Sequence, residues 1–416
     1  MEERWLILAD DLTGAADCAI AFAKRGRASA VGWGAAPAAD ERPEAFSYDA
    51  DSRNLTAEAA SARHAEALDA LLEPGRTLFK KIDSTLRGQP AAETAAAIAH
   101  LRKAGVQPFG VFAPAFPGVG RTTIEGRVRV AGEALEATEL WRRDHTYESA
   151  DLVRVLASAG VTSKTVGLAE IRGPLDELRA AFAHVAETSA VVVCDAGTDE
   201  DLARIAEASL PAAPGTFFIG SAGLAHALAA VQAKPAAQPP AVAGSQAGAL
   251  IVVGSLATTS RRGAAALRDE GLAAHIPAHP GLLLEDAAGR AALGRAVSDE
   301  LRAGEDVLVE ITVGDAFDMR LGSQLASGLA EALQPAAAVM SGFAATGGET
   351  AAALLSRFGV HGIRLVDEIE PGVSLGLSLG ALSVPVATKA GAFGDDQSLI
   401  RIVRALRAIR QKGSFA

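Results

Sequence analysis

The chain has 416 residues, 49% of them hydrophobic, and its 39 basic and 50 acidic residues give a formal net charge of −11. This length predicts more than one domain, and the hydrophobic content excludes a disordered chain. The acidic balance argues against nucleic acid as a partner, because phosphates are neutralised by a basic face. Two cysteines, Cys18 and Cys194, exclude a disulfide framework and a cysteine-based zinc site. With no targeting segment and no run of ~18 apolar residues, we expect a cytoplasmic protein without a membrane partner.

Short apolar runs alternate with segments of helical spacing along the first half of the chain. The predicted strands are residues 5–9, 77–79, 109–112, 191–194 and 216–219. The predicted helices are residues 14–25, 57–72, 91–104 and 199–208. This alternation is typical of an α/β domain with a largely parallel sheet.

A stretch rich in proline and alanine, residues 233–246, interrupts this rhythm and predicts an extended linker with a domain boundary near residue 240. Strands are then predicted at residues 250–253, 307–311, 337–340 and 384–387, and helices at residues 351–357 and 398–410. We therefore expect the α/β fold class with two domains, residues 1–232 and 247–416. Each should be a largely parallel sheet covered by helices on both faces.

The first predicted strand runs into two adjacent carboxylates, Asp10 and Asp11, followed by Thr13 and Gly14. Ligands of open α/β sheets bind outside the carboxyl ends of strands, where these acids fall. Such acids can accept protons from hydroxyl groups or hold Mg²⁺, although one of them could simply cap the following helix. Arg53 stands at a later strand-to-helix turn, where its planar fork suits a substrate carboxylate; a solvated loop arginine is the alternative.

Two further polar loops follow predicted strands in this half. Residues 80–88 combine two lysines, an aspartate, two hydroxyls and an arginine, which could bind a small polyhydroxy acid through its carboxylate and its hydroxyls. Residues 114–123 carry two prolines and two glycines that fix an unusual loop path, with Arg121 as another anion contact.

The second half offers two glycine-containing loops. A Gly347-Gly348 pair lies between a predicted strand and a predicted helix, where backbone N–H groups and the helix dipole favour a phosphate. Residues 388–396 combine a lysine with glycines after another predicted strand. The phosphate-loop pattern GxxxxGK[ST] is absent, and so is GxGxxG after the first strand. These loops indicate a nucleotide-phosphate site of a different kind.

Taken together, these motifs resemble the four-carbon acid sugar kinase family. The resemblance rests on Ala-Asp-Asp-Leu-Thr-Gly-Ala from residue 9, Asp-Ser-Arg from residue 51, Lys-Ile-Asp-Ser-Thr-Leu-Arg-Gly from residue 81, and Pro-Ala-Phe-Pro-x-x-Gly-Arg from residue 114. In the second half it rests on Gly254-Ser255, residues 347–350, Glu368 with Pro371-Gly372, and residues 389–394. It covers nearly the whole chain.

The resemblance implies a sugar-acid-binding first domain and a nucleotide-binding second domain, with ATP and Mg²⁺ as cofactors and a small sugar acid as the acceptor. The residues implied to contact the sugar acid are Asp11, Arg53, Lys81, Ile82, Asp83 and Ser84. The residues implied to contact ATP are Ser255, Thr346, Gly347, Gly348, Glu349 and Gly391. The family pattern is not matched at Ala257, Gly263 and Ala392, so we expect an altered nucleotide affinity.

The implied reaction transfers the γ-phosphoryl group of ATP to the terminal hydroxyl of 3-oxo-tetronate, threonate or erythronate, giving a 4-phosphate. Arg53 would anchor the carboxylate, and Asp11, or else Asp83, would orient or deprotonate the hydroxyl beside Lys81. Closure of the two domains about the linker would exclude water. A kinase for a different sugar acid and a sensor without turnover stay open as alternatives, and a homodimer is possible.

Overall fold

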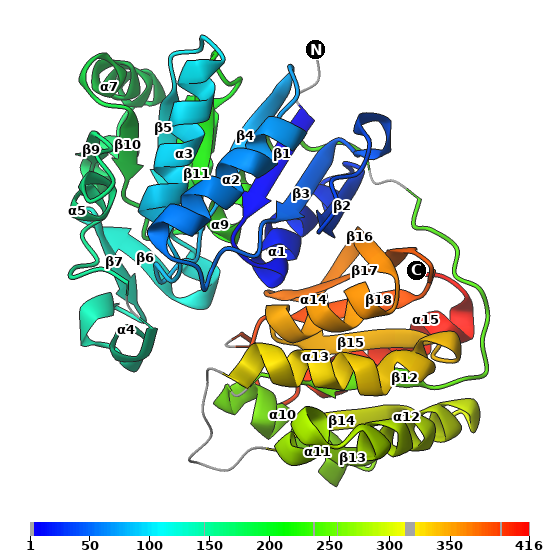
Figure 1. Cartoon of the computed structure of the whole chain (residues 1–416). Coiled ribbons are helices and arrows are strands. Elements are labelled where there is room, and N and C mark those ends of the chain that lie inside the picture. Colours follow the sequence, from blue (N-terminus) through cyan, green and yellow to red (C-terminus); the bar gives the residue numbers. More distant parts are fainter. Residues whose placement is uncertain are drawn as a thin grey trace. The chain divides into compact units, whose positions relative to one another are not determined.

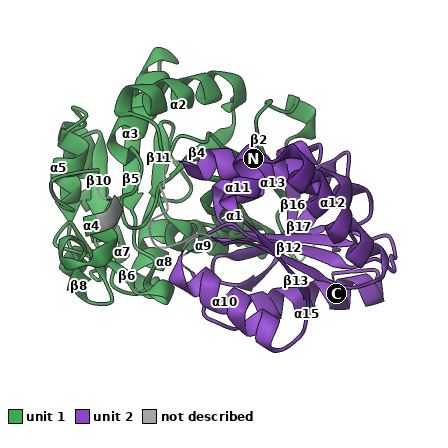
Figure 2. Ribbon diagram, turned by 60° about the horizontal axis from the view of Figure 1, so that its bottom comes forward, with its two compact units in different colours: residues 1–236 green, residues 237–416 purple. Residues whose placement is uncertain are grey.

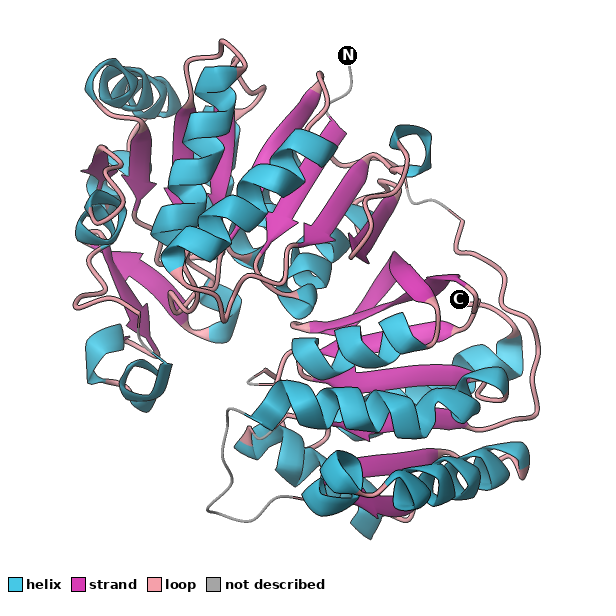
Figure 3. Ribbon diagram, viewed as in Figure 1, coloured by secondary structure: helices cyan, strands magenta, loops and turns pink. Residues whose placement is uncertain are grey.

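The computed structural model describes residues 4–144, 146–235, 238–255, 257–312, 321–391 and 393–415. The chain divides into two compact units, residues 1–236 and 237–416, shown in separate colours in Figure 2. Each unit is an α/β layer structure with its own sheet, as the colouring of helices and strands in Figure 3 makes clear.

The first unit is built on a parallel sheet in the order β2-β3-β1-β4-β11-β5-β10-β9. Its strands are β1 (Arg4–Ala9), β2 (Ser29–Trp33), β3 (Ala45–Asp49), β4 (Arg76–Lys81), β5 (Phe109–Ala113), β9 (Ser163–Val166), β10 (Val191–Cys194) and β11 (Thr216–Gly220). The central strands are buried, which suits near-continuous apolar runs such as the Trp5–Ala9 segment of β1.

Helices cover both faces of this sheet (Figure 1). On one face α1 packs against α9 and α9 against α8; on the other α2 packs against α3 and α3 against α5. The helices are α1 (Leu12–Ala23), α2 (Ala57–Leu71), α3 (Pro90–Lys103), α4 (Glu139–Asp144), α5 (Leu152–Ala157), α6 (Leu168–Ile171), α7 (Leu175–Thr188), α8 (Asp199–Ser209) and α9 (Ala222–Val231). On the α1 face Trp5 lies against Phe22 and Phe218.

A small antiparallel sheet, which the sequence analysis did not foresee, follows β5. It consists of β6 (Arg121–Ile124), β7 (Arg127–Val130) and β8 (Glu133–Ala134). Asp195, just after β10, holds its first turn by accepting hydrogen bonds from the backbone N–H groups of Glu125 (2.7 Å) and Gly126 (2.8 Å). This sheet therefore stands at the carboxyl end of the main sheet.

The second unit has a mixed sheet in the order β13-β14-β12-β15-β18-β17-β16. Its strands are β12 (Ala249–Val253), β13 (Ala274–Ala278), β14 (Val307–Ile311), β15 (Gly342–Thr346), β16 (Val360–Glu370), β17 (Val373–Gly380) and β18 (Pro385–Lys389). Its helices are α10 (Thr258–Asp269), α11 (Pro280–Glu285), α12 (Ala287–Arg302), α13 (Gly322–Leu333), α14 (Gly348–Arg357) and α15 (Ser398–Lys412). Helices α12, α13 and α14 pack side by side, as do α10 and α15.

One expectation for this unit was wrong in detail. No strand forms at residues 337–340: residues 337–338 end a 3₁₀ helix, Gln334–Ala338, and residues 339–340 follow it. The strand of this region is β15 at Gly342–Thr346. Alanine has low strand propensity, and Pro335 stands at the start of the 3₁₀ helix. The sheet is largely parallel, as expected; among its described strands β17 alone pairs antiparallel, with β16 and with β18.

The segment between the two units is attached to the first unit at its start and to the second unit at its end. Lys234 forms an ion pair with Glu44 at 2.9 Å, and its backbone N–H donates to the carbonyl of Arg25. Val242 donates its backbone N–H to the carbonyl of Gly413. Only a few residues thus lie between Lys234, attached to the first unit, and Val242, attached to the second.

Candidate active site

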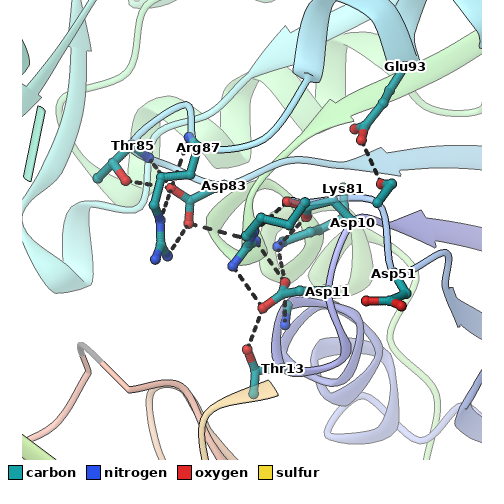
Figure 4. Close-up of polar contacts among 12 residues, drawn as sticks. Asp10, Asp11, Thr13, Asp51, Lys81, Asp83, Thr85, Arg87 and Glu93 are labelled. Carbon is teal, nitrogen blue, oxygen red and sulfur yellow. Dashed lines mark hydrogen bonds and ion pairs between the residues drawn. The ribbon is translucent and has the colours of Figure 1, made fainter. Parts of the chain in front are cut away.

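The carboxyl ends of β3, β1 and β4 lie side by side and bring charged residues of the first unit together (Figure 4). Asp10 and Asp11 follow β1, and Lys81 is the last residue of β4. The loop after β3 is fixed to the same place, because the backbone N–H groups of Ser52 and Arg53 both donate to the carbonyl of Asp10 at 3.1 Å. The sheet topology thus assembles residues that are far apart in the sequence.

The guanidinium group of Arg53 binds both aspartates. Its Nη1 and Nη2 donate to the two carboxylate oxygens of Asp11, each at 2.8 Å, and its Nε donates to Asp10 Oδ2 at 2.7 Å. Thr13 also donates its hydroxyl to Asp11 Oδ2, at 2.7 Å. In this structure the fork of Arg53, which the sequence analysis assigned to a substrate carboxylate, therefore holds the protein's own carboxylates.

Lys81 completes the cluster from the other side. Its Nζ lies 2.9 Å from Asp10 Oδ1 and 2.8 Å from Asp11 Oδ1. The space for it depends on Gly14, because a Cβ at that position would lie 1.8 Å from Lys81 Nζ. Gly14 also donates its backbone N–H to Asp11 Oδ1, so Asp11 caps α1 as well as binding both cations.

These contacts fix the charges of the cluster. Burial on its own would raise the pKa of Asp10 and of Asp11, but Arg53 and Lys81 outweigh it and hold each pKa below its ordinary value. Burial would likewise lower the pKa of Lys81, but Asp10 and Asp11 raise it. Asp11 is therefore an ionised acceptor at neutral pH and a weak base, better suited to orienting a hydroxyl than to keeping its proton.

Asp83 lies beside this group with partners of its own. Arg87 donates to it through Nη2 at 2.8 Å and Nε at 3.1 Å, and Arg53 Nη2 lies 4.0 Å away. Burial acts to raise the pKa of Asp83, but Arg87 and Arg53 hold it well below its usual value. Asp83 is thus a poor proton acceptor, and its assignment as a catalytic residue stays a prediction.

The other predicted sugar-acid residues differ in how they are placed. The side chain of Ile82 is buried in the apolar core, and its backbone N–H donates to the carbonyl of Gly220. Only the main chain of Ile82 therefore lies at the carboxyl ends of the strands. Ser84 is buried in the same turn. Arg121 opens β6; burial lowers its pKa although Asp83 acts to raise it, and its buried Nε has no hydrogen-bond partner among the described residues.

Sequence reasoning missed Asp49, the last residue of β3. Its side chain is 4% exposed and accepts the backbone N–H of Asp51 at 2.7 Å. Burial, together with the charges of Asp11, Asp51 and Asp10, raises the pKa of Asp49 to about 8. The position at a strand end was the available signal, but a single aspartate there says nothing of its burial.

We expect Asp49→Asn to be more stable than the wild type by a margin that grows with pH. Between pH 4 and 8 the unfolded wild type is ionised at residue 49 while the folded protein stays protonated, so the wild type loses stability as the pH rises through this window. Asparagine does not titrate and keeps the acceptor for Asp51. The difference in Tm should widen by roughly 5 °C or more between pH 5 and pH 8.

Asp176→Asn is the matched control, because the Asp176 side chain is 95% exposed. Its Tm should differ from the wild type by the same small amount at every pH. A margin for Asp49→Asn that stays constant from pH 5 to pH 8 would contradict the assignment of a protonated Asp49.

In the second unit three loops meet at the carboxyl ends of the neighbouring strands β12, β15 and β18. Ser255 follows β12, Gly347 and Gly348 follow β15, and Gly391 follows β18. A Cβ added at Gly391 would lie 2.3 Å from Ser255 Oγ, and one added at Gly347 would lie 3.5 Å from Ser255 Cβ. The predicted nucleotide residues of these loops are therefore brought together in the fold.

Hydrogen bonds connect these loops and hold their backbones close together. Gly347, with a φ of +91°, donates its N–H to the carbonyl of Lys389 at 3.0 Å. The hydroxyls of Thr259 and Ser260 donate to the carbonyl of Gly391 at 2.8 and 3.1 Å. The N-terminus of α14 opens at Gly348, with Glu349 in its first turn. This arrangement suits the approach of phosphate oxygens to main-chain N–H groups.

Two buried groups in this region are unusual. Lys389 is 1% exposed and donates its Nζ to the carbonyl of Ala390 at 3.2 Å; burial lowers its pKa to about 8, although Glu370 and Asp395 act to raise it. The hydroxyl oxygen of Thr346 is buried without a hydrogen-bond partner among the described residues. Lys389 belonged to a motif in the sequence analysis but was not predicted as a site residue.

The positions that depart from the family pattern are partly described. Ala257 is the N-cap of α10 and provides no side-chain cap, and Gly263 packs where a Cβ would lie 3.4 Å from Leu399. Ala392 lies outside the described residues.

Among the described residues no group of three or more His, Cys, Asp and Glu side chains could hold a metal ion. Asp10, Asp11 and Asp83 of the first unit are paired with Arg53, Lys81 and Arg87. The described chain also contains no helix with the length and hydropathy needed to cross a membrane.

The first unit has a charged cluster at the carboxyl ends of its parallel strands, and the second unit has glycine-containing loops at the carboxyl ends of its own. This architecture is typical of a two-domain α/β enzyme that acts on small molecules. Comparison with known families places residues 5–228 in the sugar-binding N-terminal domain family and residues 250–399 in the nucleotide-binding C-terminal domain family.

Curated relatives extend over almost the whole chain. The D-threonate kinase of Cupriavidus necator is 41% identical, covering 95% of this chain and 96% of the relative, and that of Bordetella bronchiseptica is 34% identical, covering 97% and 98%. A D-erythronate kinase of Heliobacterium modesticaldum (28%; 94% of each chain) and a 3-oxo-tetronate kinase of Pseudomonas savastanoi (29%; 93% and 94%) also match. The chain belongs to the four-carbon acid sugar kinase family. The expectation drawn from its motifs is confirmed.

The fold is shared with solved structures as well. A Salmonella typhimurium protein superposes with a TM-score of 0.81 at 23% identity, covering 97% of this chain and 99% of the other. At this identity the likeness concerns the fold alone.

Proposed function

We propose that this protein is an ATP-dependent kinase that phosphorylates the terminal hydroxyl of a four-carbon sugar acid to give its 4-phosphate, with D-threonate as the preferred acceptor. The observation that carries the substrate class is the match of 95% of the chain, at 41% identity, to a relative named D-threonate kinase. The matching relatives named for erythronate and 3-oxo-tetronate are 28% to 30% identical, which is lower than the 41% and favours threonate.

The cluster in the first unit has the chemistry for such an acceptor. Arg53, Lys81 and Arg87 provide cationic donors for a carboxylate, and ionised Asp11 and Asp83 provide acceptors for hydroxyl groups. Arg121 adds a partly buried guanidinium beside Asp83. A sugar acid that binds here exchanges some of the internal ion pairs for its own carboxylate, which makes its affinity depend on the geometry of Arg53.

Asp11 would orient the attacking hydroxyl. The hydroxyl oxygen forms a bond to the γ-phosphorus while the bond from that phosphorus to the β,γ-bridging oxygen breaks, and ADP leaves. Because the transition state of such a transfer is loose, the hydroxyl proton need not be removed early, and a weakly basic carboxylate suffices to align it before it passes to solvent. Lys81 neutralises charge beside this carboxylate.

The glycine-containing loops of the second unit would bind ATP. Ser255, Gly347 and Gly391 bring main-chain groups together, and buried Lys389 supplies a positive charge at the same strand ends. Mg²⁺ would accompany the nucleotide phosphates and keep several waters, since the described residues offer no carboxylate cage for it. A cytoplasmic location and a homodimer stay predictions from the sequence.

The proposal is tested by ADP release with ATP and Mg²⁺ across the stereoisomers of threonate, erythronate and 3-oxo-tetronate. We expect the highest kcat/KM with D-threonate. Turnover with another member alone would overturn the threonate assignment and keep the kinase. Nucleotide binding without turnover on any acid would favour a sensor or a different acceptor.

Gly391→Ala should weaken nucleotide binding selectively. The new methyl group would lie 2.3 Å from Ser255 Oγ, so the Ser255 hydroxyl must turn away, or the loops after β12 and β18 must move apart, where phosphate would approach. We expect the KM for ATP to rise by about tenfold, which corresponds to a loss of about 1.4 kcal/mol of binding free energy. The KM for the sugar acid should stay unchanged.

Gly281→Ala is the matched control for this variant, since a Cβ there meets no atom within 4 Å. Steady-state kinetics with each substrate varied in turn measures both constants. Equal ATP constants in the two variants would contradict the assignment of Gly391 to the nucleotide site.

A further inference from the structure

A second polar group lies buried behind the charged cluster, on the α2 and α3 face of the sheet. Glu93, in the first turn of α3, is 1% exposed. Its Oε2 lies 2.8 Å from Lys80 Nζ, and its Oε1 accepts the hydroxyl of Ser52 at 2.7 Å. Figure 4 shows Glu93 on the opposite side of the cluster from Thr13. The function derived above makes no use of these residues.

Both partners of Glu93 are chain neighbours of a cluster cation. Ser52 precedes Arg53 in the loop after β3, and Lys80 precedes Lys81 at the end of β4. Successive side chains of a strand point to opposite faces of the sheet. Lys80 therefore meets α3 while Lys81 meets Gly14 at the start of α1, and one strand end is held from both faces.

The negative charge of Glu93 is balanced by a residue in direct contact with it. Lys80, itself 1% exposed, also donates its Nζ to the carbonyl of Leu8 at 3.5 Å. His64 Nε2 lies 3.7 Å from Glu93, but burial, with the nearby Lys80, lowers the pKa of His64 to about 4, so the ring is neutral. Lys80 thus supplies the positive charge that Glu93 needs in this buried place.

We propose that Glu93 is a positioning residue, which binds Ser52 and Lys80 and thereby holds Arg53 and Lys81 in the geometry that receives the sugar acid. The proposal rests on the proposed kinase function. Glu93 ties the loop after β3 to the end of β4, through a hydrogen bond from Ser52 and an ion pair with Lys80. Its loss would let Arg53 and Lys81 shift relative to Asp10 and Asp11, and a shift of this kind lowers the population of the productive geometry.

The test compares Glu93→Gln with the wild-type chain in steady-state kinetics with each substrate varied. Glutamine keeps the shape and an acceptor for Ser52 but removes the charge that pairs with Lys80. We expect the KM for the sugar acid to rise by roughly tenfold and kcat to fall by a similar factor, with the KM for ATP within about twofold of the wild type.

Two further variants keep the test decisive. Asp201→Asn is the control for simple loss of a buried carboxylate, because Asp201 is 2% exposed, pairs with Arg172 at 2.8 Å and lies in the same unit on α8. It should lower Tm without changing either KM. Ser52→Ala removes only the hydrogen bond to Glu93 and should raise the KM for the sugar acid by roughly threefold, even if Glu93→Gln fails to fold.

The outcomes separate the inference from the function on which it rests. A wild-type chain that turns over no four-carbon acid overturns the proposed function. A wild type that is active, with Glu93→Gln and Ser52→Ala lowering Tm but keeping both KM values and kcat, overturns the positioning role. If Glu93→Gln does not fold, wild-type kinetic constants in Ser52→Ala overturn it.

Discussion

Asp11→Asn is expected to reduce kcat by about 10²- to 10⁴-fold while nucleotide affinity stays at the wild-type value. The substitution keeps the size of the side chain but removes the negative charge that accepts from both Nη atoms of Arg53 and from Lys81. The attacking hydroxyl then loses an ionised acceptor, and Arg53 and Lys81 lose part of the negative charge that balances them. Nucleotide binding is assigned to the second unit and should be unaffected.

The measurement is kcat with saturating sugar acid, together with a nucleotide titration of the same preparation. Asp176→Asn, on an exposed position of α7, serves as the control and should keep the wild-type kcat. An unchanged kcat in Asp11→Asn would remove Asp11 from the reaction and leave it as the cap of α1.

Arg53→Met is expected to abolish saturation by the sugar acid and to lower kcat/KM by at least about 100-fold. The guanidinium has three short hydrogen bonds to Asp10 and Asp11, and its side chain is 18% exposed. Removing it leaves carboxylates buried without one of their cations, which costs on the order of 3–5 kcal/mol. Tm should therefore fall as well, by roughly 10 °C.

Arg53→Lys separates charge from geometry. Lysine restores a positive charge but not the planar fork that spans both oxygens of Asp11. We expect Tm to recover most of the loss seen with methionine, whereas kcat/KM for the sugar acid stays low. Full recovery of kcat/KM in Arg53→Lys would show that a point charge is enough and would contradict the role given to the fork.

The strand ends of the first unit could be located from the sequence because apolar runs there give way abruptly to polar residues. β4 is the instructive exception. The prediction ended it at residue 79 and placed both lysines in a loop, yet the strand continues to Lys81 and both side chains are buried. Their charges do not end the strand because Glu93 pairs with Lys80, and Asp10 and Asp11 pair with Lys81.

The partners of the site residues could not be predicted in the same way. Arg53 was assigned to a ligand carboxylate, but its contact with Asp11, 42 positions away, depends on the order of strands in the sheet. Glu93 has the sequence pattern of an ordinary acid in the first turn of a helix, and its burial follows only from the packing of α3 on β4. Local patterns identify which residues carry chemistry, whereas tertiary packing decides what each one contacts.

The second unit illustrates the same limit. The glycine-containing loops were recognised from their own sequence, and the fold brings Ser255, Gly347 and Gly391 together. The hairpin of β16 and β17 was not predicted, although Pro371-Gly372 between two runs of alternating residues is a turn signal. β16 and β17 lack the continuous apolar runs by which the predicted strands were recognised, because polar residues interrupt both.

The central claim is phosphoryl transfer to the terminal hydroxyl of a four-carbon sugar acid. It is tested most directly by ³¹P nuclear magnetic resonance of a mixture of the protein, ATP, Mg²⁺ and D-threonate. We predict one new phosphomonoester signal coupled to the methylene protons of carbon 4, formed in equal amount to ADP. Inorganic phosphate as the only new signal besides those of ADP, or a phosphomonoester coupled to a methine proton, would contradict the claim.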